Sequence, residues 1–352
     1  MRRCLCIFAV LSALPLAALA PVPAAAQAGP IRFAPSSPDA WVRVDARFRP
    51  NPDVCPARQP QNLHAAYGGV LEIGRRSNGQ LYLVTELTFP EYLNGIAEVP
   101  GDWPMEALKA QVVAARTYAI SHMNPSTAVA RELRYNLCAT DACQVYRGLN
   151  VSKGPGGAAW TQAVAATSGE VLEYQGNPAR TYYFSTSNGR TYSNQEIFST
   201  APLPYLKSVK ESDDVQSPLS NWSVRMPLAD LTESLRLAKF WTGGPIERVV
   251  QANKTVTVSG AGQSRSLPMA DLRTKLNAQA VCLVPKRYPT NAPNGRPYPQ
   301  TVPSEGATVR QEGDQVVING RGWGHGVGMV QWGLKGKAER GMSYRDMLAY
   351  YY

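Results

Sequence analysis

The sequence predicts an α+β fold, in which β-hairpins and segregated helices form a groove, within one domain or two subdomains. Two observations carry this prediction. Pairs of strand-like segments are separated by short turns, and helical segments stand apart from them instead of alternating with single strands. The chain has 352 residues and no internal repeat, so it is long enough for one large domain or two of ordinary size.

Residues 1–28 are expected to be a secretory signal peptide. Arg2 and Arg3 precede an apolar run from Ile7 to Ala20, which is followed by small residues suited to cleavage. That run is too short to span a bilayer, and no later stretch reaches the roughly 20 apolar residues that a spanning helix needs. We therefore expect a secreted protein of the cell envelope or cell wall, with no transmembrane segment in the mature chain.

The chain is basic, with 36 Lys and Arg against 26 Asp and Glu and a formal net charge of +10. A basic exported protein suits an anionic cell surface or wall, and on charge alone it suits nucleic acid equally. The sequence contains no basic cluster, so a nucleic-acid partner is not expected.

Cysteine usage predicts disulfides. Two of the six cysteines lie in the predicted signal peptide, and four follow it: Cys55, Cys138, Cys143 and Cys282. An even count in an oxidising compartment favours the pairs Cys138 with Cys143 and Cys55 with Cys282. The alternative is a metal site built from Cys138, Cys143 and a histidine. No metal and no other cofactor is predicted.

The first elements follow an arm, residues 29–66, that is expected to be irregular. Residues 67–352 are expected to form the main domain. Within it, residues 68–87 predict a hairpin around Asn78-Gly79, because this dipeptide tolerates the positive φ angles of a tight turn. The apolar spacing of residues 103–123 predicts a helix, with Pro104 at its first position.

The later elements are predicted in the same way from local patterns. Residues 169–176 and 179–187 are expected to pair as strands, and residues 247–260 to form a hairpin with its turn near Asn253. Two helices, one strand and one long loop complete the assignment, in the order helix 228–240, loop 288–306, strand 314–320 and closing helix 343–352.

Glu98 is the first candidate for chemistry. Its neighbours Ile96, Ala97, Val99 and Pro100 are apolar, and such surroundings raise the pKa of a carboxyl group, so that it can donate a proton near neutral pH. A helix cap or a surface glutamate is the competing interpretation. On the following helix, Lys109 and Arg116 are seven residues apart and share one face, where they either bind an anionic substrate group or face solvent.

The segment "GRGWGHGVGMVQWG", residues 320–333, has glycine at every second position of its first nine residues. In an extended strand this alternation leaves one face as bare backbone, on which another layer of the protein packs or a sugar chain lies. Trp323 and His325 lie on the opposite face, and Trp323 is a candidate sugar-stacking platform or a buried ring. The run does not match the dinucleotide-binding pattern G-x-G-x-x-G.

A third cluster, "YYFSTSNGRTYS" at residues 182–193, is dense in hydroxyl groups. Such a cluster can orient a polyol, or it is an ordinary strand end rich in Ser and Thr. Neither G-x-S-x-G nor H-E-x-x-H occurs, so the serine hydrolase and zinc peptidase classes lack their motifs.

Together these segments resemble the stage II sporulation protein D family, SpoIID/LytB, of bacterial cell-wall proteins. The resemblance rests on "EYLNGIAEVPGDWPMEALKAQVVAARTYA", "FSTSNGRTYSNQEIF" and "GRGWGHGVGMVQWG", in the family's order, and it covers roughly residues 67–352. The sequence departs from the family at Val99, Asn188 and Val330, where methionine, glycine and serine are common. Val330 lacks the hydroxyl group that serine would supply at this position.

The resemblance implies a lytic transglycosylase that cleaves the bond between N-acetylmuramic acid and N-acetylglucosamine and leaves 1,6-anhydromuramyl ends. Glu98 would be the catalytic acid and base. The other expected site residues are substrate-binding: Lys109, Arg116, Ser185, Thr186, Ser187, Tyr192, Trp323 and His325. The expected partner is the peptidoglycan glycan strand. The alternative is a glycan-binding protein that cuts nothing and modulates a cell-wall amidase.

Overall fold

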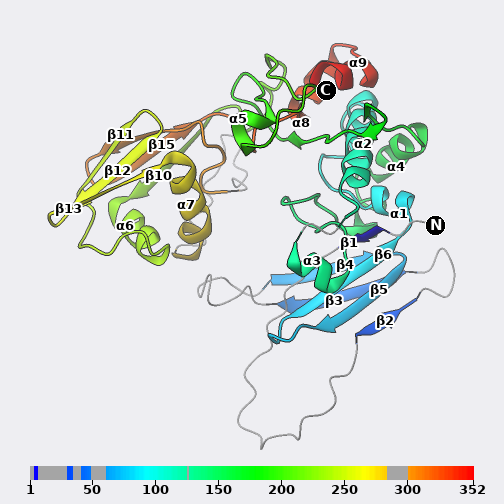
Figure 1. The fold of residues 1–352 in the computed structure, drawn as a ribbon, viewed down its shortest axis with the longest axis horizontal. Coiled ribbons are helices and arrows are strands. Elements are labelled where there is room, and N and C mark those ends of the chain that lie inside the picture. Colours follow the sequence, from blue (N-terminus) through cyan, green and yellow to red (C-terminus); the bar gives the residue numbers. More distant parts are fainter. Residues whose placement is uncertain (1–3, 7–29, 35–40, 49–60, 125–126, 284–299) are drawn as a thin grey trace, which may run out of the picture. The chain divides into compact units, whose positions relative to one another are not determined.

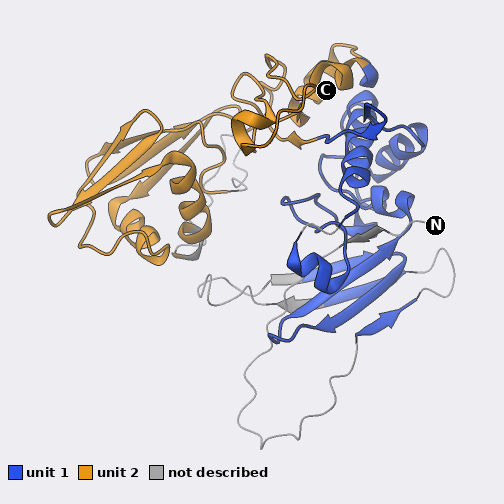
Figure 2. Ribbon diagram, in the orientation of Figure 1, with its two compact units in different colours: residues 1–51, 59–181, 343–345 blue, residues 52–58, 182–342, 346–352 orange. Residues whose placement is uncertain are grey.

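The computed structural model describes residues 4–6, 30–34, 41–48, 61–124, 127–283 and 300–352, and its elements have the expected α+β character (Figure 1). They divide between two compact units (Figure 2). Unit 1 comprises residues 1–51, 59–181 and 343–345, and unit 2 comprises residues 52–58, 182–342 and 346–352.

Unit 1 contains a four-stranded antiparallel sheet in the order β1-β6-β5-β2. Its strands are β1 (Cys4–Cys6), β2 (Ile31–Phe33), β5 (Val70–Arg75) and β6 (Leu81–Leu87). The hairpin between β5 and β6 is confirmed, and Gly79 in its turn has a φ of 85°. β1 lies inside the predicted signal peptide, so cleavage there would remove the outer neighbour of β6.

The arm at residues 29–66 differs from the irregular segment that was expected. Besides β2 it contains β3 (Val42–Phe48), which pairs along its whole length with β4 (Gln61–Tyr67). The segment Trp41-Val42-Arg43-Val44 leads into β3, and no local feature of the sequence indicates that β4 is its partner.

The helical segments in the described part of unit 1 are α1 (Phe89–Asn94), α2 (Met105–Ser121), α3 (Ala128–Leu133), the 3-10 turn η1 (Gly148–Asn150) and α4 (Gly157–Ala166). α2 confirms the predicted helix, with Pro104 as its N-cap instead of its first residue. Most of α2 is buried, and its alanines let α4 pack closely against it. On α4, the Trp160 indole donates a hydrogen bond of 2.8 Å to the Leu93 carbonyl at the end of α1.

The second predicted strand pair is wrong. β7 (Glu173–Tyr174) turns back at once to β8 (Asn177–Pro178), because Gln175 and Gly176 have φ values of 51° and 75° that close a tight turn. β9 (Tyr183–Phe184) instead pairs in parallel with β16 (Met329–Val330).

The described part of unit 2 contains two three-stranded antiparallel sheets. One has the order β10-β15-β14 and the other β11-β12-β13. Their strands are β10 (Trp222–Pro227), β11 (Arg248–Ala252), β12 (Thr255–Gly260), β13 (Gln263–Pro268), β14 (Thr308–Glu312) and β15 (Gln315–Gly320). The predicted hairpin at residues 247–260 is confirmed, with Asn253 at a φ of 53° in its turn, and β15 confirms the strand predicted at 314–320.

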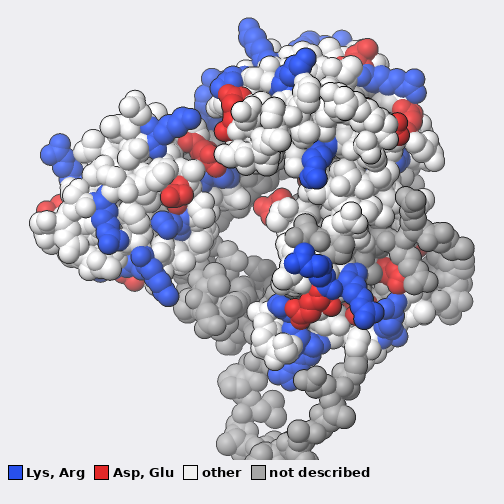
Figure 3. Space-filling view, in the orientation of Figure 1, with Lys and Arg blue, Asp and Glu red and all other residues white. Residues whose placement is uncertain are grey.

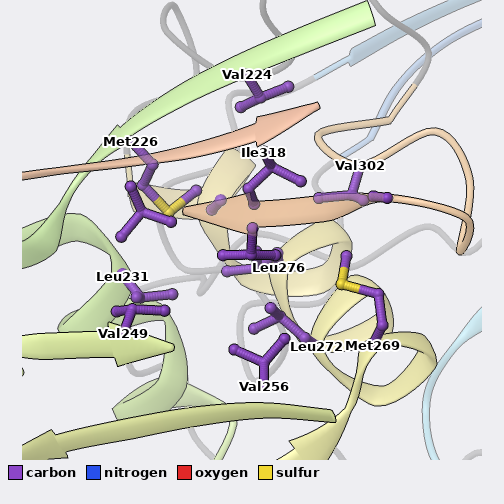
Figure 4. Close-up of a cluster of buried hydrophobic side chains, with 14 of the residues drawn as sticks. Val224, Met226, Leu231, Val249, Val256, Met269, Leu272, Leu276, Val302 and Ile318 are labelled. Atoms are coloured by element: carbon purple, nitrogen blue, oxygen red, sulfur yellow. The ribbon is translucent and has the colours of Figure 1, made fainter. Parts of the chain in front are cut away.

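The helices of unit 2 include α6 (Leu228–Leu237), which was predicted, and α7 (Met269–Leu283), which was not. Both contribute to one apolar core with the two sheets. Figure 4 shows Leu272 and Leu276 of α7 pointing toward Ile318 of β15, beside Val256 of β12. The chain continues through α5 (Asn194–Phe198), α8 (Gln331–Glu339) and α9 (Tyr344–Tyr351), of which α9 confirms the predicted closing helix. The predicted loop at 288–306 lies mostly outside the described residues.

A buried ionic cluster fixes α8 in unit 2. The Lys337 ammonium donates hydrogen bonds of 2.9 Å and 3.0 Å to the two Glu211 carboxylate oxygens and of 2.7 Å to Asp213. The Tyr351 hydroxyl also donates to Glu211, and burial raises the pKa of this phenol well above its usual value. Gly333 lies against Glu211 and Tyr351, where a side chain would collide with both. None of the helices among the described residues is long and apolar enough to cross a membrane.

Candidate functional site

The Glu98 carboxylate in unit 1 is held by the backbone of a segment distant in sequence. The Val145 amide donates a hydrogen bond of 2.6 Å to Glu98 Oε1. The same two segments are joined by the bond from the Ala97 amide to the Val145 carbonyl, 2.8 Å, and by a bridge between Ile96 and Tyr146. Glu98 is half-buried, so its carboxyl group is positioned by rigid backbone at the edge of the core.

The helix-cap interpretation that competed for Glu98 applies to its neighbour Glu91. Glu91 Oε2 accepts hydrogen bonds of 2.7 Å from both the amide and the hydroxyl of Thr88 at the N-terminus of α1. Two carboxylates seven residues apart therefore have different tasks, since one closes a helix end and the other is fixed by a distant loop.

The two predicted cations of α2 differ in their surroundings. Lys109 is partly exposed and forms an ion pair of 2.8 Å with Glu106 one turn before it. Arg116 is 6% exposed and donates to the carbonyls of Glu170, at 3.0 Å, and Val164, at 3.3 Å. Burial lowers the pKa of Arg116. Its guanidinium group connects α2 to the end of α4 and therefore stabilises the fold of unit 1.

The glycine run in unit 2 is not the regular strand that was expected. Gly322, Gly324, Gly326 and Gly328 all have positive φ angles, from 77° to 115°, a region that extended strands do not use. A Cβ atom on Gly322 would lie 2.5 Å from the Thr186 carbonyl oxygen, and one on Gly328 would lie 2.1 Å from that of Tyr182. The bare backbone of the glycine run is therefore covered by another part of the protein, residues 182–192, which is one of the two alternatives that the sequence left open.

The hydroxyl-bearing residues Ser185, Thr186 and Ser187 directly follow β9 and are buried. The Thr186 hydroxyl lies 2.6 Å from that of Ser217 and 3.1 Å from that of Ser185. The Ser187 amide donates a hydrogen bond of 2.6 Å to Asp214, and burial raises the pKa of this aspartate. Thr186 and Ser187 are thus hydrogen-bonded to the loop that carries Asp214 and Ser217.

His325 is a neutral histidine surrounded by aromatic rings. Burial lowers its pKa to about 4. Nδ1 accepts a hydrogen bond of 3.1 Å from the Val327 amide, and the rings of Phe184 and Phe198 lie with their centroids 5.6 Å and 5.3 Å away. Because Nδ1 is an acceptor, the single proton of the ring resides on Nε2.

A pocket in unit 2 of about 280 Å³ brings four of the predicted residues together, namely Thr186, Ser187, Tyr192 and His325. The glycine run forms part of the same wall through Gly324 and Gly326, and the opposite wall comes from the β11–β12 turn and the start of α7. Pockets that combine apolar rings with a few polar groups are typical of small-ligand sites. Trp323 does not line this pocket, because its side chain packs against the apolar core.

Sequence reasoning missed several residues of this pocket: Asn188, Arg190, Gln251, Lys254 and Arg321. Asn188 donates a hydrogen bond of 2.7 Å to the Tyr192 hydroxyl, and the Arg190 guanidinium lies over the Tyr192 ring. The run "SNGRTYS" contained the signal for these two residues and the glycine run that for Arg321, whereas Gln251 and Lys254 come from a segment without such a motif.

The predicted site residues fall in different units, with Glu98, Lys109 and Arg116 in unit 1 and the remaining ones in unit 2. That Glu98 shares a groove with Ser187 and Trp323 stays a prediction. Figure 3 shows Lys and Arg spread over the visible face of both units, without one dominant patch.

The predicted disulfide between Cys138 and Cys143 is present, with their Cα atoms 5.4 Å apart. Both sulfurs are therefore used in a covalent bond, which replaces the alternative of a metal site with these two ligands. Within the part of the chain that the structure describes, no group of three or more His, Cys, Asp or Glu side chains could hold a metal ion. The predicted pairing of Cys55 with Cys282 lies outside the described side chains.

Comparison with known proteins shows which family this chain is related to. Residues 77–174 match the model of the SpoIID family, described as stage II sporulation protein. The chain is 31% identical over 280 residues to stage II sporulation protein D of Bacillus subtilis, covering 76% of this chain and 74% of that protein. It is 30% identical over 294 residues to an uncharacterized protein of Brachyspira hyodysenteriae, covering 78% and 68%. An amidase enhancer of Bacillus subtilis is 28% identical over 290 residues, which are 72% of this chain and 38% of the enhancer.

The family model matches within unit 1, whereas stage II sporulation protein D of Bacillus subtilis matches over 76% of the chain, and the chain belongs to the stage II sporulation protein D family.

Proposed function

We propose that this protein acts on the bacterial cell wall as a lytic transglycosylase that cleaves glycan strands between N-acetylmuramic acid and N-acetylglucosamine. The observation that carries the proposal is the half-buried Glu98 carboxyl group, whose position is fixed by the Val145 amide and the paired backbone around it. A group that gives and takes a proton in one reaction must stay in place between the two steps.

The chemistry requires one carboxyl group. Glycosidases that use water or a covalent intermediate employ a pair of carboxyl groups, whereas an intramolecular attack needs no second one. Glu91 supports this scheme, because its carboxylate is engaged at the N-terminus of α1.

In the proposed reaction, Glu98 protonates the glycosidic oxygen as the bond from the muramyl anomeric carbon to that oxygen breaks. The resulting carboxylate accepts the proton of the muramyl C6 hydroxyl, whose oxygen forms the new bond to the same carbon. Oε1 accepts the Val145 N–H, so the transferred proton is held by Oε2. The products are an N-acetylglucosamine end and a 1,6-anhydromuramyl end.

The experiment is digestion of purified, peptide-free glycan, with the products analysed by mass spectrometry. Wild-type protein should produce anhydromuramyl ends. Glu98→Gln keeps the size of the side chain and its acceptor for the Val145 amide but cannot donate the proton, so it should lower the rate by about 10²–10⁴-fold. Glu91→Gln is the matched control, since it changes a carboxylate that has a structural task.

The second candidate function is glycan binding without cleavage, in support of a cell-wall amidase. It is favoured by the similarity to a relative that is called an amidase enhancer. This candidate predicts that the protein cosediments with cell wall, that it forms no anhydromuramyl ends, and that Glu98→Gln leaves its effect on an amidase unchanged.

A further inference from the structure

The segment that holds Glu98 follows a short loop that is closed by the Cys138–Cys143 disulfide. Val145, whose amide donates a hydrogen bond of 2.6 Å to Glu98 Oε1, lies two residues after Cys143. At the other end of the loop, the buried Leu137 anchors the chain in the core of unit 1. The covalent bond therefore joins the two ends of the loop just before the residue that fixes the carboxyl group.

The tip of this loop contributes little to the core. Thr140, Asp141 and Ala142 are exposed. The Cys143 amide donates a hydrogen bond of 2.9 Å to the Thr140 carbonyl, and the Cys138 amide lies 3.1 Å from Cys143 Sγ. Segments with few buried side chains and solvent-exposed hydrogen bonds open most easily. The disulfide is therefore the main constraint on the shape of the loop.

Backbone hydrogen bonds couple the loop to Glu98. The Tyr146 amide donates a hydrogen bond of 3.2 Å to the carbonyl of Ala139, which lies inside the loop. The preceding residue, Val145, accepts a hydrogen bond of 2.8 Å from the Ala97 amide and donates to Glu98. A displacement of the loop would therefore move the donor that holds the Glu98 carboxyl group.

A second anchor of the same segment does not depend on the disulfide. The fully buried Gln144 side chain donates a hydrogen bond of 3.2 Å to the Ala115 carbonyl and accepts one of 2.6 Å from the Tyr92 hydroxyl. The ring of Tyr146 stacks on that of Tyr92, with their centroids 5.6 Å apart. Opening the disulfide should thus loosen the Val145 amide without unfolding unit 1.

We propose that the Cys138–Cys143 disulfide is a positioning element for Glu98, so that the protein reaches its full cleavage rate only after these two cysteines are oxidised. The inference rests on the proposed function in taking Glu98 as the catalytic group. The oxidation is a thiol–disulfide exchange, in which an S–S bond forms between the two cysteines and that of an oxidant disulfide breaks. The oxidant takes up the two electrons and two protons and becomes two thiols.

This exchange would place activity in an oxidising compartment. Both cysteines are half-buried, so an oxidant or a reductant can reach them. Disulfides persist outside the cytosol, where thiols are not kept reduced. A reaction that supplies disulfides would therefore precede efficient cleavage by this protein.

The kinetic test compares oxidised wild-type protein with protein reduced by dithiothreitol, which becomes a cyclic disulfide. The rate of formation of anhydromuramyl ends is measured on peptide-free glycan at several concentrations. Reduction should lower kcat about ten-fold and leave KM within about two-fold, because the carboxyl group is displaced while the binding surfaces stay in place. Reoxidation with glutathione disulfide should restore kcat. The fluorescence of Trp103 and Trp160, both buried in unit 1, should show that the reduced protein is folded.

Two variants assign the effect to this pair of cysteines. Cys138→Ala/Cys143→Ala should have the lowered kcat whether or not dithiothreitol is present. The matched control, Cys55→Ala/Cys282→Ala, removes the other expected pair and should respond to dithiothreitol as wild-type protein does. The inference would be overturned by equal kcat values of oxidised and reduced wild-type protein. It would also fail if Cys138→Ala/Cys143→Ala still lost rate on reduction, since the effect would then arise elsewhere.

Hydrogen–deuterium exchange gives a readout that needs no activity. On reduction, the amides of Ala97 and Val145 should exchange about ten-fold faster, as measured by mass spectrometry of the peptides that contain them, while amides in the middle of α2 keep their protection. Unchanged exchange at these two amides would contradict the proposed positioning, even if kcat fell.

The outcome is separable from that of the proposed function. If oxidised wild-type protein forms anhydromuramyl ends and reduction changes neither kcat nor exchange, only the inference fails. If neither form of the protein cleaves glycan while reduction speeds exchange at Val145, the disulfide still positions the Glu98 carboxyl group and the cleavage reaction fails.

Discussion

Replacing Lys337 by methionine should destabilise unit 2 strongly, because the ammonium group neutralises two buried carboxylates. The Glu211 side chain is fully buried and that of Asp213 is 7% exposed. Methionine keeps the length and apolar volume of lysine, so the variant leaves no large cavity. Its cost comes from leaving buried carboxylates without their cation, which typically amounts to about 3–5 kcal/mol. Arg340 compensates only in part, since it contacts Asp213 from a side chain that is 60% exposed.

The assay is urea unfolding at neutral pH, followed by the fluorescence of Trp222 and Trp241, which are both buried in unit 2. A loss of about 4 kcal/mol corresponds to a midpoint lowered by about 2 M urea. The control is Lys335→Met on the same helix, which removes a partly exposed ion pair with Glu339 and should cost at most about 0.5 kcal/mol. A cost below about 1 kcal/mol for Lys337→Met would refute the reasoning that this ammonium group compensates buried charge.

Three further predictions follow from the structure. Gly328→Ala should lower the free energy of unfolding by about 2–4 kcal/mol, because the position has a positive φ and a Cβ atom there would lie 2.1 Å from a carbonyl oxygen. The control Gly341→Ala, at a φ of 85° with open space around it, should lower it by only about 1 kcal/mol. Because the pKa of His325 is lowered to about 4, the unfolded chain binds a proton between pH 6.5 and about 4 that the folded chain does not. The free energy of unfolding should therefore fall by about 2–3 kcal/mol as the pH drops through this window. His325→Asn should remove that part of the pH dependence, as measured by melts at several pH values. Replacing Cys138 and Cys143 by alanine should cost about 2 kcal/mol, because the disulfide closes a short loop, and a non-reducing melt that shows no loss would count against this estimate.

The elements that could be predicted from sequence are those with local signals. Asn78-Gly79 and the turn at Asn253 closed hairpins as expected, and the apolar spacing of α2 gave a helix. β14 and α7 were missed although both carry a local signal: Gly313-Asp314 is a two-residue turn between β14 and β15, and Leu272, Leu276 and Ala280 recur at helical spacing in α7. β9 was assigned the wrong partner because its true partner β16 lies far along the chain.

The site was predictable as a set of segments but not as a geometry. Periodicity placed Lys109 and Arg116 on one face of a helix, yet α2 is buried on most sides, and only the folded structure shows that Arg116 faces α4. Alternation suggested a strand for residues 320–328, because a sequence does not show that each glycine adopts a positive φ. Arg321 lies in the glycine run but was not chosen as a site residue, and Lys254 could not be singled out, since its turn meets that run only through the tertiary fold.

The most direct test of the account is the analysis of the ends that form when peptide-free glycan is incubated with wild-type protein and with Glu98→Gln. We expect 1,6-anhydromuramyl ends with wild-type protein and nearly none with the variant, while both proteins bind the glycan alike. Reducing muramyl ends instead of anhydro ends, or equal cleavage by the two proteins, would contradict it.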